Sequence, residues 1–152
     1  MDHEKTCCVT GHRDIPAELV NKIQQLLRME ILAAIEDGYT HFISGFAVGA
    51  DLLFAEIVAE LKEACPITLE AAIPYPGRMK TPDETFQRLI RCYDTVKIHS
   101  DVYSKGCYMR RNRYMVNQSQ RVIAVYDGRL CGGTAATVWY AKGKDVRVVW
   151  GK

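Results

Sequence analysis

The stretch His41-Phe42-Ile43-Ser44-Gly45-Phe46-Ala47-Val48-Gly49-Ala50-Asp51 joins a short apolar run to a turn with two glycines and then to a helical pattern. Residues 41–44 form a bounded apolar run, which is typical of a buried strand. Residues 50–62 are strongly apolar and long enough for a helix. The stretch therefore predicts a strand, a glycine turn and a helix in succession, the repeating unit of an α/β fold.

The same alternation extends in both directions from this unit. Strands are expected at residues 6–10, 41–44, 67–73, 96–99, 121–126 and 145–150, and helices at 17–36, 50–62, 82–93, 109–119 and 134–142. Strands that alternate with helices favour a mostly parallel sheet with helices on both faces. We expect one α/β domain over residues 1–152, with the order of the strands left open.

Composition narrows the class of protein. The chain has 152 residues, of which 48% are hydrophobic and 25% are charged, the balance of an ordinary globular domain. No segment approaches the about 20 apolar residues of a membrane span, and residues 1–5 carry no secretory pattern. We therefore expect a cytoplasmic protein with no membrane partner. The net charge of +2 is too small to indicate nucleic acid by itself.

The cysteines and histidines are dispersed. Cys7 and Cys8 are neighbours in an expected core strand, and no C-x-x-C pair indicates zinc or redox chemistry. We interpret the six cysteines as free thiols that pack as small apolar groups. No metal site is expected, because no ligand spacing links His3, His12, His41 and His99.

Four expected strands end in unusual turns, at residues 11–14, 45–51, 74–78 and 127–134. In an open parallel sheet, ligands bind beyond the carboxyl ends of the strands. Glycine lets backbone approach a ligand, and the helix starts at Gly49 and Gly133 offer unpaired N–H groups to a phosphate. With Arg13 and Arg78, these turns indicate a phosphate-bearing ligand. The alternative is that the glycines only make tight turns.

Two familiar nucleotide motifs are absent. The chain has no G-x-x-x-x-G-K-[ST] sequence, which argues against a P-loop NTPase. It also has no G-x-G-x-x-G sequence after a strand, which argues against a standard dinucleotide oxidoreductase.

Three residues are candidates for catalysis. His12 follows a strand and precedes Arg13, so it could contact a phosphate or transfer a proton. Asp51 lies in the first turn of an expected helix, and Asp127 ends an expected strand. Each carboxylate could bind a ribose hydroxyl or activate water against an N-glycosidic bond, or it could only cap backbone N–H groups. In the third turn, Tyr75 and Arg78 could stack on a base and hold a phosphate.

The segment 103–114 (YSKGCYMRRNRY) interleaves basic and aromatic residues without an acid. Its arginines fall near a helix start, where the helix dipole disfavours cations. They therefore require a nearby anion, which could be a ligand phosphate, an acidic side chain or a nucleic-acid backbone. Nucleic acid ranks below the small ligand because the net charge is low, and a solvated surface with one internal ion pair is the further alternative.

The ordered set Thr10-Gly11-His12-Arg13, Ser44-Gly45-x-x-x-Gly49-Ala50-Asp51, Ile73-Pro74-Tyr75-Pro76 and Gly132-Gly133-Thr134-x-x-Thr137 resembles the YpsA-like branch of the SLOG superfamily. The resemblance covers nearly the whole chain. It implies a Rossmann-like three-layer sandwich, a bacterial origin and a nucleotide or nucleotide-derived ligand. SLOG domains include the LOG phosphoribohydrolases and the DNA-processing protein DprA. The resemblance assigns to the ligand cleft Gly11, His12, Arg13, Gly45, Gly49, Asp51, Gly132, Gly133 and Thr134.

One departure from the superfamily pattern concerns catalysis. LOG enzymes carry P-G-G-x-G-T-x-x-E, in which the glutamate serves catalysis. Here residues 131–139 read CGGTAATVW, and Thr137 stands nearest the position of that glutamate. The resemblance therefore leaves open whether this chain catalyses any reaction.

The leading interpretation is a module that senses or sequesters a nucleotide or nucleotide sugar, with no certain cofactor. One alternative is an N-glycosidic hydrolase that uses Asp51 or Asp127 with His12. The other is a nucleic-acid or protein-interaction domain that uses segment 103–114. A homodimer is a further expectation from the superfamily. The residues expected to bind the ligand are Gly11, His12, Arg13, Ser44, Gly45, Gly49, Ala50, Asp51, Tyr75, Arg78, Arg110, Arg111, Asn112, Asp127, Gly132, Gly133, Thr134 and Thr137.

Overall fold

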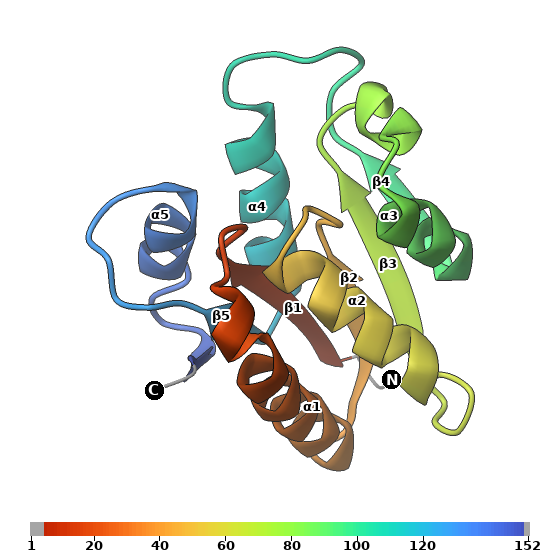
Figure 1. The fold of residues 1–152 in the computed structure, drawn as a ribbon, viewed down its shortest axis with the longest axis vertical. Helices are drawn as coiled ribbons and strands as arrows, with labels where there is room; N and C mark the ends of the chain where they lie inside the picture. Colours follow the sequence, from red (N-terminus) through yellow and green to blue (C-terminus); the bar gives the residue numbers. More distant parts are fainter. Residues whose placement is uncertain (1–4, 151–152) are drawn as a thin grey trace.

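Parallel strands run through the centre of the computed structural model, which describes residues 5–150 (Figure 1). All neighbouring strands of the six-stranded sheet pair in parallel, so the expected α/β class is confirmed. The strands are β1 (Lys5–Gly11), β2 (Tyr39–Ser44), β3 (Thr68–Ile73), β4 (Thr95–Ile98), β5 (Arg121–Val125) and β6 (Asp145–Val149). The α-helices are α1 (Val20–Glu36), α2 (Ala50–Leu61), α3 (Glu84–Leu89), α4 (Cys107–Gln118) and α5 (Gly133–Tyr140).

The strand order is β4-β3-β2-β1-β5-β6. The chain moves outward from β1 to β4 and then crosses to β5, on the other side of β1. Right-handed crossovers in opposite directions place their helices on opposite faces of the sheet. Accordingly, α1, α2 and α3 form one layer, and α4 and α5 form the other. The direction of the strand order reverses between β1 and β5, which is where open α/β sheets place their ligands.

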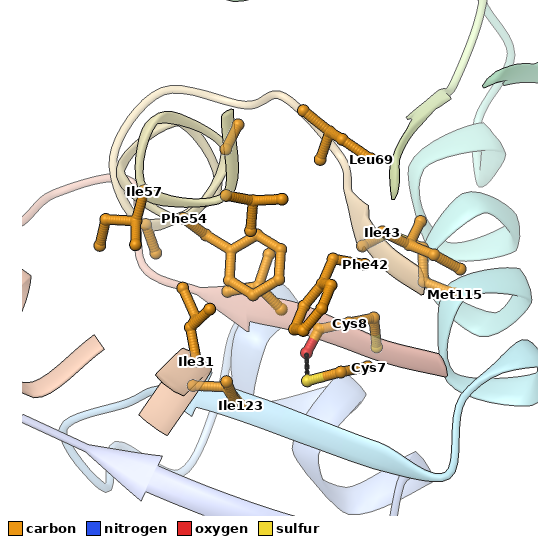
Figure 2. Close-up of a cluster of buried hydrophobic side chains, with 14 of the residues drawn as sticks. Cys7, Cys8, Ile31, Phe42, Ile43, Phe54, Ile57, Leu69, Met115 and Ile123 are labelled. Atoms are coloured by element: carbon orange, nitrogen blue, oxygen red, sulfur yellow. Dashed lines mark hydrogen bonds between the residues drawn. The ribbon is translucent and has the colours of Figure 1, made fainter. Parts of the chain in front are cut away.

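The core lies on both faces of the sheet. The buried face of α1 consists of Ile23, Leu27, Ile31 and Ala34, which recur at helical spacing. Phe42 of β2 and Phe54 of α2 pack with ring centroids 6.1 Å apart (Figure 2). Cys7 and Cys8 are also buried there, and burial raises the pKa of Cys8 to about 12. The Cys8 thiol therefore packs as a neutral group.

Two expected helices start later than their sequence patterns predicted. Residues 17–19 form a 3₁₀ turn before α1 begins at Val20. Helix α3 begins at Glu84 because the Asp83 carboxylate accepts a hydrogen bond from the Phe86 N–H at 3.0 Å, which makes Asp83 the N-cap. Pro82 therefore precedes the cap and is not in the first turn.

A buried polar cluster joins the sheet to α4. Glu70 of β3 lies 2.8 Å from Nε2 of His41, and the Tyr114 O–H donates to the other Glu70 oxygen at 2.5 Å. Burial alone would raise the pKa of Glu70, but the hydrogen bonds from His41 and Tyr114 outweigh burial and lower it. The ionised carboxylate thus stabilises the fold, and this stabilisation is lost as the pH falls through the lowered pKa.

Replacing Glu70 by glutamine should therefore cost stability in a pH-dependent way. We expect Glu70→Gln to lower the free energy of unfolding by about 1–3 kcal/mol at pH 7, and by less at pH 3, because the contribution of the carboxylate declines as the pH falls toward and through its lowered pKa. Urea unfolding at the two pH values measures the difference. The exposed Glu63→Gln is the control, with a change within about 0.5 kcal/mol at both. An equal cost of Glu70→Gln at both pH values would contradict the assignment.

Candidate ligand-binding cleft

A cleft of about 500 Å³ lies beyond the carboxyl end of β1, at the reversal point of the sheet. Its volume falls within the range of small-ligand sites. The turns after β1 and β5 and the starts of α4 and α5 supply most of its lining. The lining residues are Val9, Thr10, Gly11, His12, Arg13, Asp14, Ala47, Asp51, Gly106, Tyr108, Met109, Arg111, Asn112, Arg129, Cys131, Gly132, Gly133 and Thr134.

The structure brings together half of the residues that the sequence predicted for the ligand. Those that line the cleft are Gly11, His12, Arg13, Asp51, Arg111, Asn112, Gly132, Gly133 and Thr134. Those outside the lining are Ser44, Gly45, Gly49, Ala50, Tyr75, Arg78, Arg110, Asp127 and Thr137. The difference follows from how each turn packs.

The glycines of the first two turns serve internal packing. A Cβ on Gly11 would lie 2.3 Å from the Cβ of Ala50, and a Cβ on Gly49 would lie 2.5 Å from the carbonyl oxygen of His12. Gly49 also has a φ of +85°, which favours glycine. The N–H of Ala50 donates to the His12 carbonyl at 3.1 Å. The N-terminus of α2 is therefore packed against the turn after β1.

Ser44 stabilises the second turn from inside. Its side chain is fully buried, and its hydroxyl donates to the Asp51 carbonyl at 2.8 Å. The same hydroxyl oxygen accepts a hydrogen bond from the Phe46 N–H at 3.1 Å. Ser44 thus holds the turn between β2 and α2 in shape.

The glycines before α5 are open to the cleft. A Cβ on Gly132 or Gly133 would meet no atom within 4 Å. Gly132 has a φ of +103°, whereas Gly133 starts the helix and lies outside the left-handed region. The first N–H groups of a helix have no partner within it. The start of α5 therefore offers an accessible N–H edge to an anion in the cleft.

Asp51 and Arg111 are buried side chains of opposite charge that lie near each other at the base of the cleft. A Cβ on Gly45 would lie 2.6 Å from Nη1 of Arg111 and 2.7 Å from Oδ2 of Asp51, so both side chains occupy the space that glycine leaves. Burial raises the pKa of Asp51, while Arg111 and the Ala47 N–H, 3.3 Å from Oδ2, act against the rise. Asp51 is therefore a buried carboxyl group in a polar cleft, a common setting for proton transfer.

Three of the five N–H donors of the Arg111 guanidinium bind groups of the protein. Its Nη1 donates to the carbonyls of Gly45 and Ala72 at 2.8 and 3.1 Å, and its Nε donates to Asn112 at 2.8 Å. Only 3% of Arg111 is exposed. The anion that the sequence pattern required near this arginine is thus Asp51, which belongs to the protein.

The arginines of segment 103–114 lie in different surroundings. Arg110 is exposed and donates to the Ser104 hydroxyl at 3.0 Å, whereas Arg113 lies 5.3 Å above the ring of Tyr140. Tyr108 has the guanidinium of Arg13 on its ring at 5.1 Å and that of Arg111 at 5.6 Å. The segment therefore places Arg111 in the interior and leaves Arg110 and Arg113 at the surface.

His12 and Asp127 form a hydrogen-bonded pair beside the cleft. Nε2 of His12 lies 3.0 Å from Oδ1 of Asp127, and His12 packs edge-on against Trp150. Arg129 donates to both oxygens of Asp127, including a 2.7 Å bond from Nη2. These hydrogen bonds lower the pKa of Asp127 strongly. Asp127 is consequently a weak base, and Asp51 is the stronger candidate for proton transfer.

Arg129 lines the cleft and also lies 3.5 Å from Asp14, and no sequence motif predicted it as a site residue. It follows Asp127 by two residues in the turn after β5, and this spacing was its available signal. Asp14, Met109 and Cys131 also line the cleft and were not singled out. No local pattern distinguishes these three residues from ordinary surface positions.

Two further predicted positions pack elsewhere. Tyr75 lies edge-on to Tyr103 and Tyr108, with centroids 5.5 and 6.2 Å away, and Arg78 lies over the ring of Phe86. Both therefore stabilise the turn after β3.

Thr137 occupies a buried position between α4 and α5. Its hydroxyl donates to the Gly133 carbonyl at 2.8 Å and accepts from the Asn112 amide at 3.1 Å. No carboxylate therefore stands at the position nearest the glutamate of the LOG pattern.

Within residues 5–150, no three histidine, cysteine or acidic side chains gather closely enough to hold a metal ion. His3 lies outside the described residues. No helix in the described part of the chain is both long and apolar enough to span a membrane.

A family model described as the YspA SLOG family matches residues 7–145. The chain belongs to this SLOG family. The resemblance inferred from the glycine motifs is therefore confirmed. No curated protein matches the sequence significantly.

Two solved structures share the fold of this SLOG chain. DNA processing protein A from Helicobacter pylori, described with its single-stranded DNA binding mode, has a TM-score of 0.67 and 19% identity over 95% of this chain. The SLOG chain spans 64% of that protein, just under two thirds. TM1055, a structural-genomics target, has a TM-score of 0.59 and 14% identity, with 93% of this chain and 72% of that chain covered. At these identities the likeness shows the Rossmann-like three-layer fold alone.

The same substitution should cost much more stability at the buried Arg111 than at the exposed Arg110. We expect Arg111→Met to lower the free energy of unfolding by about 3 kcal/mol or more, because it leaves Asp51 and two carbonyls without their partner. Arg110→Met, at the adjacent exposed position, should change it by less than about 0.5 kcal/mol. Denaturant unfolding of both variants measures this. Equal costs would show that Arg111 is not the internal partner described above.

Proposed function

We propose that the cleft binds a small phosphorylated ligand of the nucleotide or nucleotide-sugar class, and that the protein senses or sequesters this ligand. The observation that carries the proposal is the open N-terminus of α5 at Gly132 and Gly133, facing a polar cleft of about 500 Å³. Helix N-termini with bare N–H groups favour phosphate oxygens through hydrogen bonds and the helix dipole.

The charges of the cleft favour the same ligand class. Arg13 and Arg129 line it, and Thr134 adds a hydroxyl at the start of α5. Asp127 and Asp14 hold the guanidinium of Arg129 in place before any ligand arrives. A positioned guanidinium loses less conformational entropy when it binds a phosphate than a free side chain would. The carboxyl group of Asp51 lies inside the cleft, where its oxygens can accept hydrogen bonds from ribose hydroxyls.

Gly133→Ala is the direct test of the phosphate position. The added methyl group meets no protein atom within 4 Å, so we expect stability to stay within about 0.5 kcal/mol of the wild type. The same methyl group would obstruct a phosphate at the helix start, so binding should weaken at least about tenfold, or 1.4 kcal/mol. Calorimetry with nucleoside mono- and diphosphates and ADP-ribose measures the affinity. Gly49→Ala provides the contrast, because its Cβ would strike the His12 carbonyl and lower stability.

The panel should also contain short single-stranded DNA, because the structurally similar DNA processing protein A is described with a single-stranded DNA binding mode. If no phosphorylated small molecule binds at millimolar concentration, the proposal is wrong. If DNA alone binds, and its affinity falls steeply with salt, the nucleic-acid interaction replaces it.

The buried carboxyl group of Asp51 supports a second candidate, hydrolysis of an N-glycosidic bond. Burial raises the pKa of Asp51 above the ordinary aspartate value, which brings this group closer to the working range of a general base.

For this second candidate, we expect the wild type to release base from a nucleoside monophosphate, with a rate that rises with pH through the raised pKa of Asp51. Asp51→Asn should then lower kcat at least about 100-fold, the usual order for a lost general base. Asp127→Asn should cost less, because Asp127 is a weaker base. Chromatography of the released base measures the rates. Absence of base release by the wild type would leave the binding function alone.

A further inference from the structure

A second cavity of about 540 Å³ adjoins the cleft. Its lining is mainly apolar and aromatic, from the turn after β5, the start of α4 and one side of α5. Characteristic lining residues are Tyr126, Leu130, Ala136, Trp139 and Tyr140. We refer to this cavity as the aromatic groove.

The groove and the cleft share part of their walls. Met109, Cys131 and Gly132 line both cavities, so the backbone before α5 forms a common border. On one side of this border the lining carries Arg13, Arg129 and the helix start. On the other side it is mainly apolar and aromatic, with Arg113 as its one charged residue in the described part of the chain. A ligand that crosses Gly132 would therefore place an anionic part in one cavity and an apolar part in the other.

The aromatic side chains of the groove are accessible in the described structure. Trp139 is 75% exposed and Leu130 is 98% exposed, which is unusual for side chains of this size. Tyr140 is held in position, because its O–H donates to Asn117 at 2.9 Å and Arg113 lies over its ring at 5.3 Å. One positioned ring and one accessible indole beside a phosphate site favour a flat aromatic ligand group.

We propose that the aromatic groove receives the base of a nucleotide whose phosphate lies in the cleft. This inference rests on the proposed function and adds to it the part of the protein that recognises the base of the ligand. Stacking on Trp139 supplies affinity with little discrimination between bases, since every base presents a π-face. Sugar phosphates without a base would use the cleft alone and bind more weakly.

The test compares adenosine 5′-monophosphate and uridine 5′-monophosphate with ribose 5-phosphate, which lacks the base. We expect Trp139→Ala to weaken binding of both nucleotides about tenfold and to leave ribose 5-phosphate unchanged. Ala136→Leu, which fills the groove from an exposed helical position, should have the same selective effect. The control is Met29→Ala, a substitution of a 65% exposed apolar residue on α1, in the other helix layer. Calorimetry gives the affinities.

Fluorescence gives an independent readout, because the chain has two tryptophans, Trp139 and Trp150. In the Trp150→Phe variant, the nucleotides should quench Trp139 and ribose 5-phosphate should not. If ribose 5-phosphate and the nucleotides all fail to bind, the proposed function fails and the inference fails with it. If all bind equally and Trp139→Ala has no effect, only the inference is overturned. It is also overturned if Trp139→Ala dissociates a dimer without changing nucleotide affinity, since the groove would then be a protein interface.

Discussion

The buried guanidinium of Arg111 is the interaction on which the carboxyl edge of the sheet depends. From α4 it donates to the carbonyls of Gly45 and Ala72, at the ends of β2 and β3, and it lies near Asp51 of α2. One side chain thus joins the two helix layers through the sheet. A buried charge must keep its partners, because leaving either member of such a pair uncompensated is costly. This requirement explains why Gly45 has no side chain and why the base of the cleft is fixed.

Glycines around the cleft divide into two groups with different physical reasons. Gly11 and Gly49 permit the N-terminus of α2 to touch the turn after β1, and any side chain there would collide with protein atoms. A Cβ on Gly132 or Gly133 would meet no atom within 4 Å, and these two glycines leave the N-terminus of α5 exposed. The first group builds the wall of the cleft, whereas the second leaves room for a ligand. The same residue type in the same kind of turn therefore serves packing in one place and access in another.

Membership of the YspA SLOG family and the likeness to DNA processing protein A agree on the architecture. The polar residues of this chain's cleft differ from those of the LOG pattern. Thr137, the residue nearest the position of the glutamate in the LOG pattern, links α4 to α5 through Asn112. The carboxyl group inside the cleft is instead that of Asp51, on the other helix layer. A reaction in this cleft would therefore need a different residue for proton transfer from the one in the LOG pattern.

The sequence by itself determined the elements, their parallel arrangement and the family. The apolar periodicity of α1 and the glycine turns after β1, β2 and β5 are local patterns, and local burial and backbone freedom suffice to produce them. Only the tertiary structure decided that β5 lies beside β1, which creates the cleft, because strand order depends on pairings between distant segments. It also decided the directions of neighbouring side chains: Arg110 and Arg111 look alike in sequence, but the helix turns by about 100° between them. That rotation carries one arginine to solvent and the other to the carbonyls of two strands.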